Sequence, residues 1–218
     1  MKTLNEDELD ALNRIIQDVN ITIESNFSAS SYSKAFICLT PILVSLYFKI
    51  MSHDSKNRSW KNRDMVFSLN EDINTVKNIV EIHADYSPIV DIKNYLRDYN
   101  FQKAENTLGE AIGYYLTQKD LEDNHKKYFF VIMSEKDLLN NFSSLEYIAK
   151  NKLKRIISLV YTKSSSKELN RENKINGRLI SLGFDTLVIS GDSVSSICDA
   201  FVYAKKIDKP TIILANLN

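Results

Sequence analysis

The residues most able to do chemistry lie where an apolar segment gives way to a polar one. Residues 128–141, YFFVIMSEKDLLNN, begin like a buried strand and continue like a helix. At such a junction α/β proteins usually bind phosphate, on a glycine-rich turn that leads into a helix N-terminus. Here the turn is Met133-Ser134-Glu135, which has no glycine and carries a carboxylate. Its residues therefore do not predict an anion-binding loop.

Other reactive residue types do not form a recognisable site in the sequence. The chain has five glycines, and no two of them have the spacing of a GxGxxG or Walker loop. The three histidines, His53, His83 and His125, are not paired with cysteine or carboxylate at metal-ligand spacing. No serine stands in a G-x-S-x-G elbow. From residue types alone we predict neither catalytic residues nor metal ligands.

Two polar stretches leave an alternative open. KSSSKE at 163–168 follows the end of an expected strand and could bind an anion through Lys163 and Lys167, although a solvated loop is the simpler interpretation. LGEAIG at 108–113 comes nearest to a glycine-rich loop, and close packing of a helix is the simpler interpretation there.

Length and composition favour one domain spanning 1–218. The chain has 218 residues and few proline or glycine residues that would mark a linker. Its 28 basic and 28 acidic residues give zero formal net charge, whereas a general nucleic-acid binder usually carries a basic excess. We therefore expect no nucleic-acid partner.

The two cysteines and the apolar segments predict a cytoplasmic protein that does not cross a membrane. Cys38 and Cys198 lie in apolar helical contexts, so we expect buried thiols in a reducing compartment. Residues 1–10 are acidic and polar, unlike a signal peptide. The most apolar stretch, 35–51, contains Lys49 and other polar residues, which favours a core helix over a membrane span.

The rest of the chain alternates helices with apolar strands. Strands are expected at 65–69, 128–133, 155–161, 185–190 and 211–216, and helices at 6–24, 35–52, 72–83, 88–98, 104–121, 136–151, 168–182 and 193–206. Continuous apolar strands that alternate with helices are typical of a parallel sheet covered on both faces. The fold class is therefore α/β, with three layers and a central, mostly parallel sheet.

The order of several short stretches resembles the N-terminal, diphosphate-binding domain of transketolase. SWKNRDMVFSL at 59–69 resembles that family's strand ending in Ser-Asn-Gly-His-Gly. YFFVIMSEKD at 128–137 resembles its strand ending in Gly-Asp-Gly, and RIISLVYTK at 155–163 resembles its strand ending in Asp-Asp-Asn. The stretches at 24–30, 104–116 and 179–216 follow the family in the same order. The resemblance covers about residues 5–216 and implies a thiamine-diphosphate-binding fold.

The resemblance also implies a cofactor cleft in which this chain departs from the family. Transketolases bind thiamine diphosphate with magnesium or calcium, which needs hard oxygen ligands. The positions that match the family's metal-binding Asp and Asn hold Ser134 and, within a residue, Lys163, while Glu135 replaces a glycine. Phe27 stands at a histidine position of the family, and Gly109 is retained. We therefore expect no bound thiamine diphosphate or magnesium.

Two smaller departures point the same way. Asn106 replaces a glycine of the family, and Glu71 stands at or next to its second early histidine.

Three functional interpretations follow from the resemblance. The first is a pseudoenzyme that acts as a binding, regulatory or structural partner. The second is the N-terminal subunit of a split transketolase, and the third is a small-molecule sensor that uses the old cleft.

Family members pair around the cofactor cleft, which predicts a homodimer or a transketolase-like partner subunit. The helices at 104–121 and 136–151 would lie near that interface. The apolar residues expected to form the contact are Leu108, Ile112, Tyr115, Leu138, Leu139 and Phe142.

Overall fold

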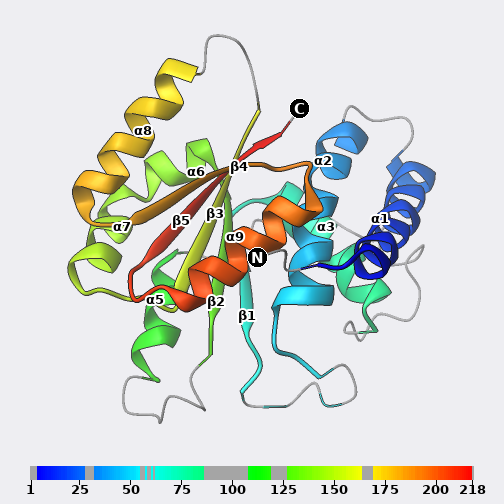
Figure 1. Cartoon of the computed structure of the whole chain (residues 1–218), viewed down its shortest axis with the longest axis horizontal. Helices are drawn as coiled ribbons and strands as arrows, with labels where there is room; N and C mark the ends of the chain where they lie inside the picture. Colours follow the sequence, from blue (N-terminus) through cyan, green and yellow to red (C-terminus); the bar gives the residue numbers. More distant parts are fainter. Residues whose placement is uncertain are drawn as a thin grey trace.

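A five-stranded parallel sheet forms the centre of the molecule (Figure 1). The computed structural model describes residues 4–27, 32–54, 57, 60, 62–85, 108–118, 127–163 and 169–217. The strands are β1 (Met65–Ser68), β2 (Phe129–Ser134), β3 (Ile156–Lys163), β4 (Asp185–Ser190) and β5 (Thr211–Leu217). They lie in the order β1-β2-β3-β5-β4, and every neighbouring pair is parallel. The predicted parallel sheet is confirmed.

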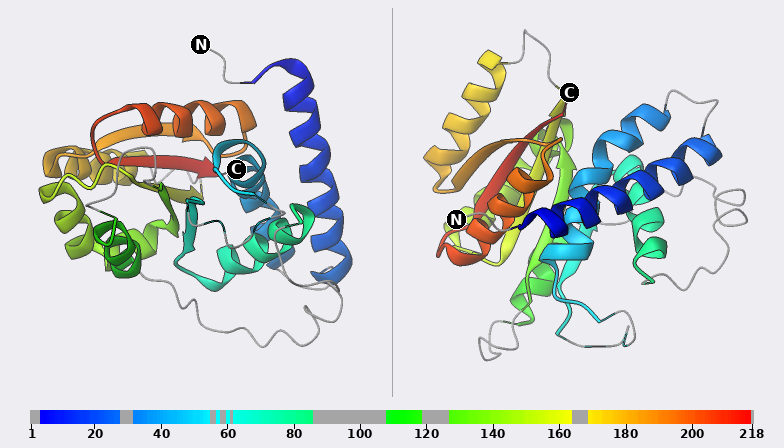
Figure 2. Two further views of the ribbon diagram at one scale, coloured as in Figure 1. Left: turned by 90° about the horizontal axis from the view of Figure 1, so that it is seen from below. Right: turned by 45° about the vertical axis from the view of Figure 1, so that its right-hand side comes forward.

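Helices cover both faces of this sheet (Figure 2), which confirms the three-layer α/β architecture. One face carries α1, α2, α3, α9 and the π-helix η1, and the other carries α5, α6, α7 and α8. Their bounds are α1 Glu6–Phe27, α2 Tyr32–Ser45, η1 Leu46–Ile50, α3 Glu71–His83, α5 Leu108–Leu116, α6 Glu135–Asn140, α7 Phe142–Lys150, α8 Leu169–Leu182 and α9 Val194–Lys206.

The two covered faces explain why β2 is apolar at every position but its last. Phe130 and Ile132 belong to the core cluster on the α1–α3 side, whereas Phe129 and Val131 belong to the cluster on the α5–α8 side. Side chains of a strand alternate between the faces of its sheet, so a strand buried on both faces loses the alternation of apolar and polar residues.

The most apolar segment forms α2 and η1 and packs inside the domain, as expected for a core helix. Leu43, Leu46 and Tyr47 are buried there. The hydrogen bond from Met51 N–H to the carbonyl of Leu46 closes a π-type turn. Among the described residues, Ser33–Ile50 is the one helical stretch long and apolar enough to cross a membrane, and 56% of it is buried inside the protein. That is weak evidence for a membrane span.

The single helix expected at 136–151 was a wrong prediction. The chain forms α6 and α7 instead, separated at Asn141, whose φ of −108° and ψ of 21° are not helical. The side chain of Asn141 donates to the carbonyl oxygen of Asp137 at 2.8 Å. Asparagine favours such local bonds to the backbone, which compete with a continuous helix. The helix expected at 88–98 and the ends of the one expected at 104–121 lie outside the described residues.

The apolar patch expected to form a dimer contact is mostly part of the domain's own core. Leu108 and Leu138 are fully buried, and Ile112, Tyr115 and Phe142 pack against the same core cluster. Of the six residues in the expected patch, only Leu139 is exposed, at 41%. This surface therefore gives no support to an interface, because its apolar side chains already have partners within the chain.

Candidate functional site

Polar side chains from three strands meet at the carboxyl edge of the sheet. Ser134 ends β2 and pairs in register with Tyr161 of β3. Asn70 follows β1, the strand on the other side of β2, and is the N-cap of α3. Because parallel strands end at the same edge, residues distant in the sequence lie together there, and ligands of α/β proteins usually bind at that edge.

Asp137 is the centre of this polar cluster. Its Oδ2 atom accepts from the Ser134 backbone N–H at 2.9 Å and from the Ser134 hydroxyl at 2.6 Å. The same oxygen accepts from the side-chain amide of Asn70 at 2.9 Å. In return, the Asp137 backbone N–H donates to Ser134 Oγ at 3.2 Å, which completes a capping box at the start of α6.

Asn70 joins the cluster to the neighbouring strands. Its Oδ1 accepts from the Ile73 N–H at 3.0 Å, and its Nδ2 donates both to Asp137 and, at 3.2 Å, to the hydroxyl of Tyr161. All hydrogen-bonding groups of the amide are therefore used within the protein. Burial raises the pKa of Tyr161 to about 12, although the hydrogen bond from Asn70 acts in the opposite direction.

This arrangement leaves little at the N-terminus of α6 for an anion. Both Glu135 and Asp137 lie in the first turn of the helix. Carboxylates there interact favourably with the helix dipole, which is the role a bound phosphate would otherwise take. Two of the backbone N–H groups, those of Ser134 and Asp137, already donate to side chains of the capping box.

The hydrogen bonds of the cluster disfavour a metal ion at Asp137 Oδ2. This oxygen already accepts three hydrogen bonds, and a metal bound to it would have to displace these donors. In the part of the chain that the structure describes, no group of three or more His, Cys, Asp or Glu side chains could hold a metal ion.

The structure places the sequence-predicted cleft residues as follows. Ser134 and Glu135 lie at the junction of β2 and α6, and Lys163 is the last residue of the adjacent strand β3. Gly109 is exposed in α5. Phe27 ends α1 and packs edge-to-face on Phe36, with ring centroids 5.1 Å apart.

Sequence reasoning missed the other members of the cluster, which are Asn70, Asp137 and Tyr161. The spacing Ser134-x-x-Asp137 was a usable signal, because it resembles a capping box directly after a strand. Asn70 and Tyr161 gave no comparable signal, because strand pairing brings them to the cluster from distant parts of the sequence. Asn70 is 67 positions from Asp137 and 91 positions from Tyr161.

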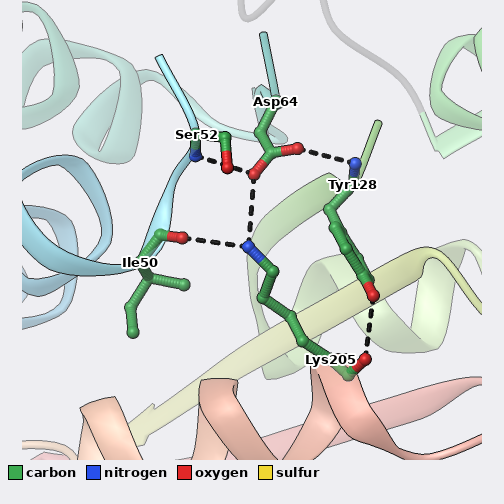
Figure 3. A network of polar contacts seen from close by, with 5 residues as sticks. All are labelled: Ile50, Ser52, Asp64, Tyr128 and Lys205. Atoms are coloured by element: carbon green, nitrogen blue, oxygen red, sulfur yellow. Dashed lines mark hydrogen bonds and ion pairs between the residues drawn. The ribbon is translucent and has the colours of Figure 1, made fainter. Parts of the chain in front are cut away.

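A second polar network lies at the opposite, amino-terminal edge of the sheet (Figure 3). Asp64, which directly precedes β1 and is only 3% exposed, accepts from the backbone N–H groups of Ser52 and Tyr128 at 2.9 and 2.8 Å. Lys205 of α9 donates to the carbonyl of Ile50 at 3.1 Å. These contacts join a loop, two strands and a helix, which indicates a structural role.

Comparison with known families gives no match, and no curated protein matches in sequence. Solved structures do match in fold. A transketolase from Leishmania mexicana superposes with a TM-score of 0.78 at 14% identity, over 96% of this chain and 36% of that one. A transketolase from Campylobacter jejuni subsp. jejuni gives 0.76 at 17% identity, over 98% and 38%. A transketolase mutant from Pichia Stipitis gives 0.74 at 16%, over 93% and 35%.

The chain therefore has the fold of the N-terminal domain of transketolase. It spans 35–38% of the length of these transketolases. At such low identity the likeness establishes the fold, whereas the activity depends on the residues of the site.

Proposed function

We propose that this chain is a catalytically degenerate transketolase-like domain that acts as a binding, regulatory or structural partner. The observation that carries the proposal is the carboxylate of Asp137, which accepts hydrogen bonds from Ser134 and Asn70 at the strand-to-helix junction. That junction resembles the Gly-Asp-Gly loop of transketolase, where backbone N–H groups and a metal hold the diphosphate.

Electrostatics support the loss of cofactor binding. A diphosphate carries several negative charges, which must be neutralised when water is removed. Here the first turn of α6 contributes Glu135 and Asp137, both negative. One such charge next to a phosphate costs on the order of a few kcal/mol at an effective dielectric near 20. Among the described residues, no group of three or more His, Cys, Asp or Glu side chains could hold a cation that would offset that repulsion.

The direct test is to titrate the full chain with thiamine diphosphate and magnesium. A ligand at a hundred times its dissociation constant would stabilise the folded state by about 2.7 kcal/mol, which corresponds to a Tm increase of several degrees. We expect no change in Tm at millimolar concentrations of both. Magnesium pyrophosphate and magnesium alone are the matched controls for nonspecific anion and cation effects.

A magnesium-dependent rise in Tm, confirmed by calorimetry, would contradict the loss of cofactor binding. That result would favour the second candidate, an N-terminal subunit of a split thiamine-diphosphate-dependent transketolase. The observation that favours this candidate is the fold, because almost the whole chain superposes on one part of the transketolases it resembles. Affinity purification from native cells, with mass spectrometry of the captured chains, would then identify a partner that carries the remaining transketolase segment.

A further inference from the structure

Among the described residues, strand β4 forms an edge of the sheet, and its own sequence lacks the residues that usually protect such an edge. It runs between α8 and α9 (Figure 2, right). Natural edge strands carry lysine, proline or bulges that prevent pairing with another chain. β4 has the sequence DTLVIS, with neither lysine nor proline, and it pairs with β5 in unbroken register. The side chain of Val188, near its middle, is 51% exposed.

The backbone N–H and C=O groups of alternate residues in β4 point away from β5, toward the outer edge of the sheet. Asp185 N–H donates to the carbonyl of Pro210 at 3.0 Å, and Gly191 N–H donates to the carbonyl of Asn216 at 2.7 Å. Odd-numbered residues therefore face β5, and the N–H and C=O groups of Thr186, Val188 and Ser190 point away from it. Within the described part of the chain, β5 is the one strand that pairs with β4.

We propose that β4 pairs with β4 of a second copy of this chain, antiparallel and with the two-fold axis at Val188. In this register Val188 lies opposite Val188 of the second copy, and Thr186 lies opposite Ser190. All three are residues whose backbone groups point outward, so the pairing forms about six interchain hydrogen bonds. The two five-stranded sheets become one continuous sheet.

The side chains of β4 are self-complementary in this register. Leu187 lies opposite Ile189 of the second copy, so apolar residues meet apolar residues. The hydroxyls of Thr186 and Ser190 meet each other, and Asp185 lies opposite Gly191 rather than opposite another charge.

Neighbouring registers lose this match. An axis at Leu187 would place Asp185 opposite Ile189, and an axis at Ile189 would place Val188 opposite Ser190. Register is strongly specified only where the side chains of both strands agree with it. The sequence of β4 therefore favours a symmetric pairing centred on Val188.

This interface does not depend on the proposed function. It lies at the far edge of the sheet from β1 and does not use the Asp137 cluster between β1 and β3. A dimer could form whether or not the domain binds thiamine diphosphate, so each proposal can fail without the other.

The first test compares the mass of the full chain with that of Val188→Lys, by light scattering and sedimentation across micromolar concentrations. The wild type should be a dimer. Two lysines opposite each other at the axis should weaken dimerisation about ten-fold or more, because like charges directly opposite destabilise strand pairing and the valine contact is lost. The matched control is Ile21→Lys in α1, which changes a side chain that is 60% exposed and should leave the dimer intact.

A second variant keeps the test decisive if Val188→Lys unfolds. Val188→Cys places two thiols opposite each other across the axis, within the Cα separation that a disulfide tolerates. Under mild oxidation it should form a covalent dimer, whereas the wild type, which retains Cys38 and Cys198, should not. A wild-type monomer at every concentration would overturn the proposal. So would a dimer that neither Val188→Lys weakens nor Val188→Cys crosslinks.

Discussion

Nζ of Lys205 lies 3.5 Å from Oδ2 of Asp64, although the two residues are 141 positions apart. The same lysine lies over the ring of Tyr128, 4.7 Å from its centroid, and the Tyr128 hydroxyl donates to the Lys205 carbonyl at 2.8 Å. Asp64 also accepts from two backbone N–H groups, of Ser52 and Tyr128. One buried carboxylate thus joins α9 to the start of β1 and β2.

We expect Asp64→Ala to lower the free energy of unfolding by about 3 kcal/mol, because it leaves two backbone N–H groups without their acceptor and the largely buried Lys205 ammonium without its carboxylate. Asp64→Asn retains a carbonyl acceptor and should cost less. Urea denaturation measures both. The matched control is Asp208→Ala, which removes an exposed partner of Lys154 and should change stability by no more than about 0.5 kcal/mol. Equal effects at Asp64 and Asp208 would contradict a structural role for the network.

Two glycines should respond to alanine in opposite directions. A Cβ at Gly191 would lie 2.5 Å from Leu217 Cδ2 and 3.2 Å from the carbonyl oxygen of Asn216, whereas a Cβ at Gly177 of α8 would meet nothing within 4 Å. Gly191→Ala should therefore destabilise the fold by about 1–3 kcal/mol through overpacking. Gly177→Ala should stabilise it by about 0.5–1 kcal/mol, because alanine is the better helix former. Thermal unfolding of both variants is the measurement, and a neutral Gly191→Ala would mean that the Leu217 side chain moves aside freely.

His83 should make the fold less stable in mild acid. Burial lowers its pKa below the usual 6.5, while Asp18 acts in the opposite direction. In the unfolded chain the imidazole binds a proton more readily, so protonation favours unfolding. The stabilising contribution of the neutral His83 to the free energy of unfolding is complete above pH 6.5. It is lost as the pH falls through the lowered pKa of the folded state.

The measurement is the free energy of unfolding between pH 8 and about 5. His83→Gln should flatten the decline, and Asp18→Asn should steepen it because the carboxylate that supports the imidazolium is removed. A decline that is identical in the wild type and His83→Gln would show that other groups control the acid sensitivity.

Asp137 should matter for stability in the absence of any ligand. Asp137→Ala removes the acceptor of Ser134 and Asn70 at the start of α6, and the loss of a capping interaction costs about 1–2 kcal/mol. Lys136→Ala, at the exposed neighbouring position, is the control and should be nearly neutral. If Asp137→Ala is as stable as the wild type, the cluster contributes nothing to the fold and a ligand-binding role for Asp137 gains weight.

Local pattern was sufficient to predict the strands and most of the helices. The continuous apolar run of β2 indicated a strand buried on both faces, and the structure confirms it. The start of α6 at the strand end was also predicted, because the sequence turns polar there. The break at Asn141 was missed, since a single asparagine is common in an intact helix and only its bond to Asp137 reveals the turn.

The order of the strands, and everything that depends on it, was decided by the tertiary structure. DTLVIS and TIILAN look alike as apolar strands, yet β5 lies inside the sheet and β4 at its edge. The same holds for Asn70, which reaches Asp137 only because β1 and β2 are neighbours. The spacing of apolar residues along the sequence indicates which face of a helix or strand is buried. It carries no information on which element lies alongside, because that choice depends on contacts between residues far apart in the chain.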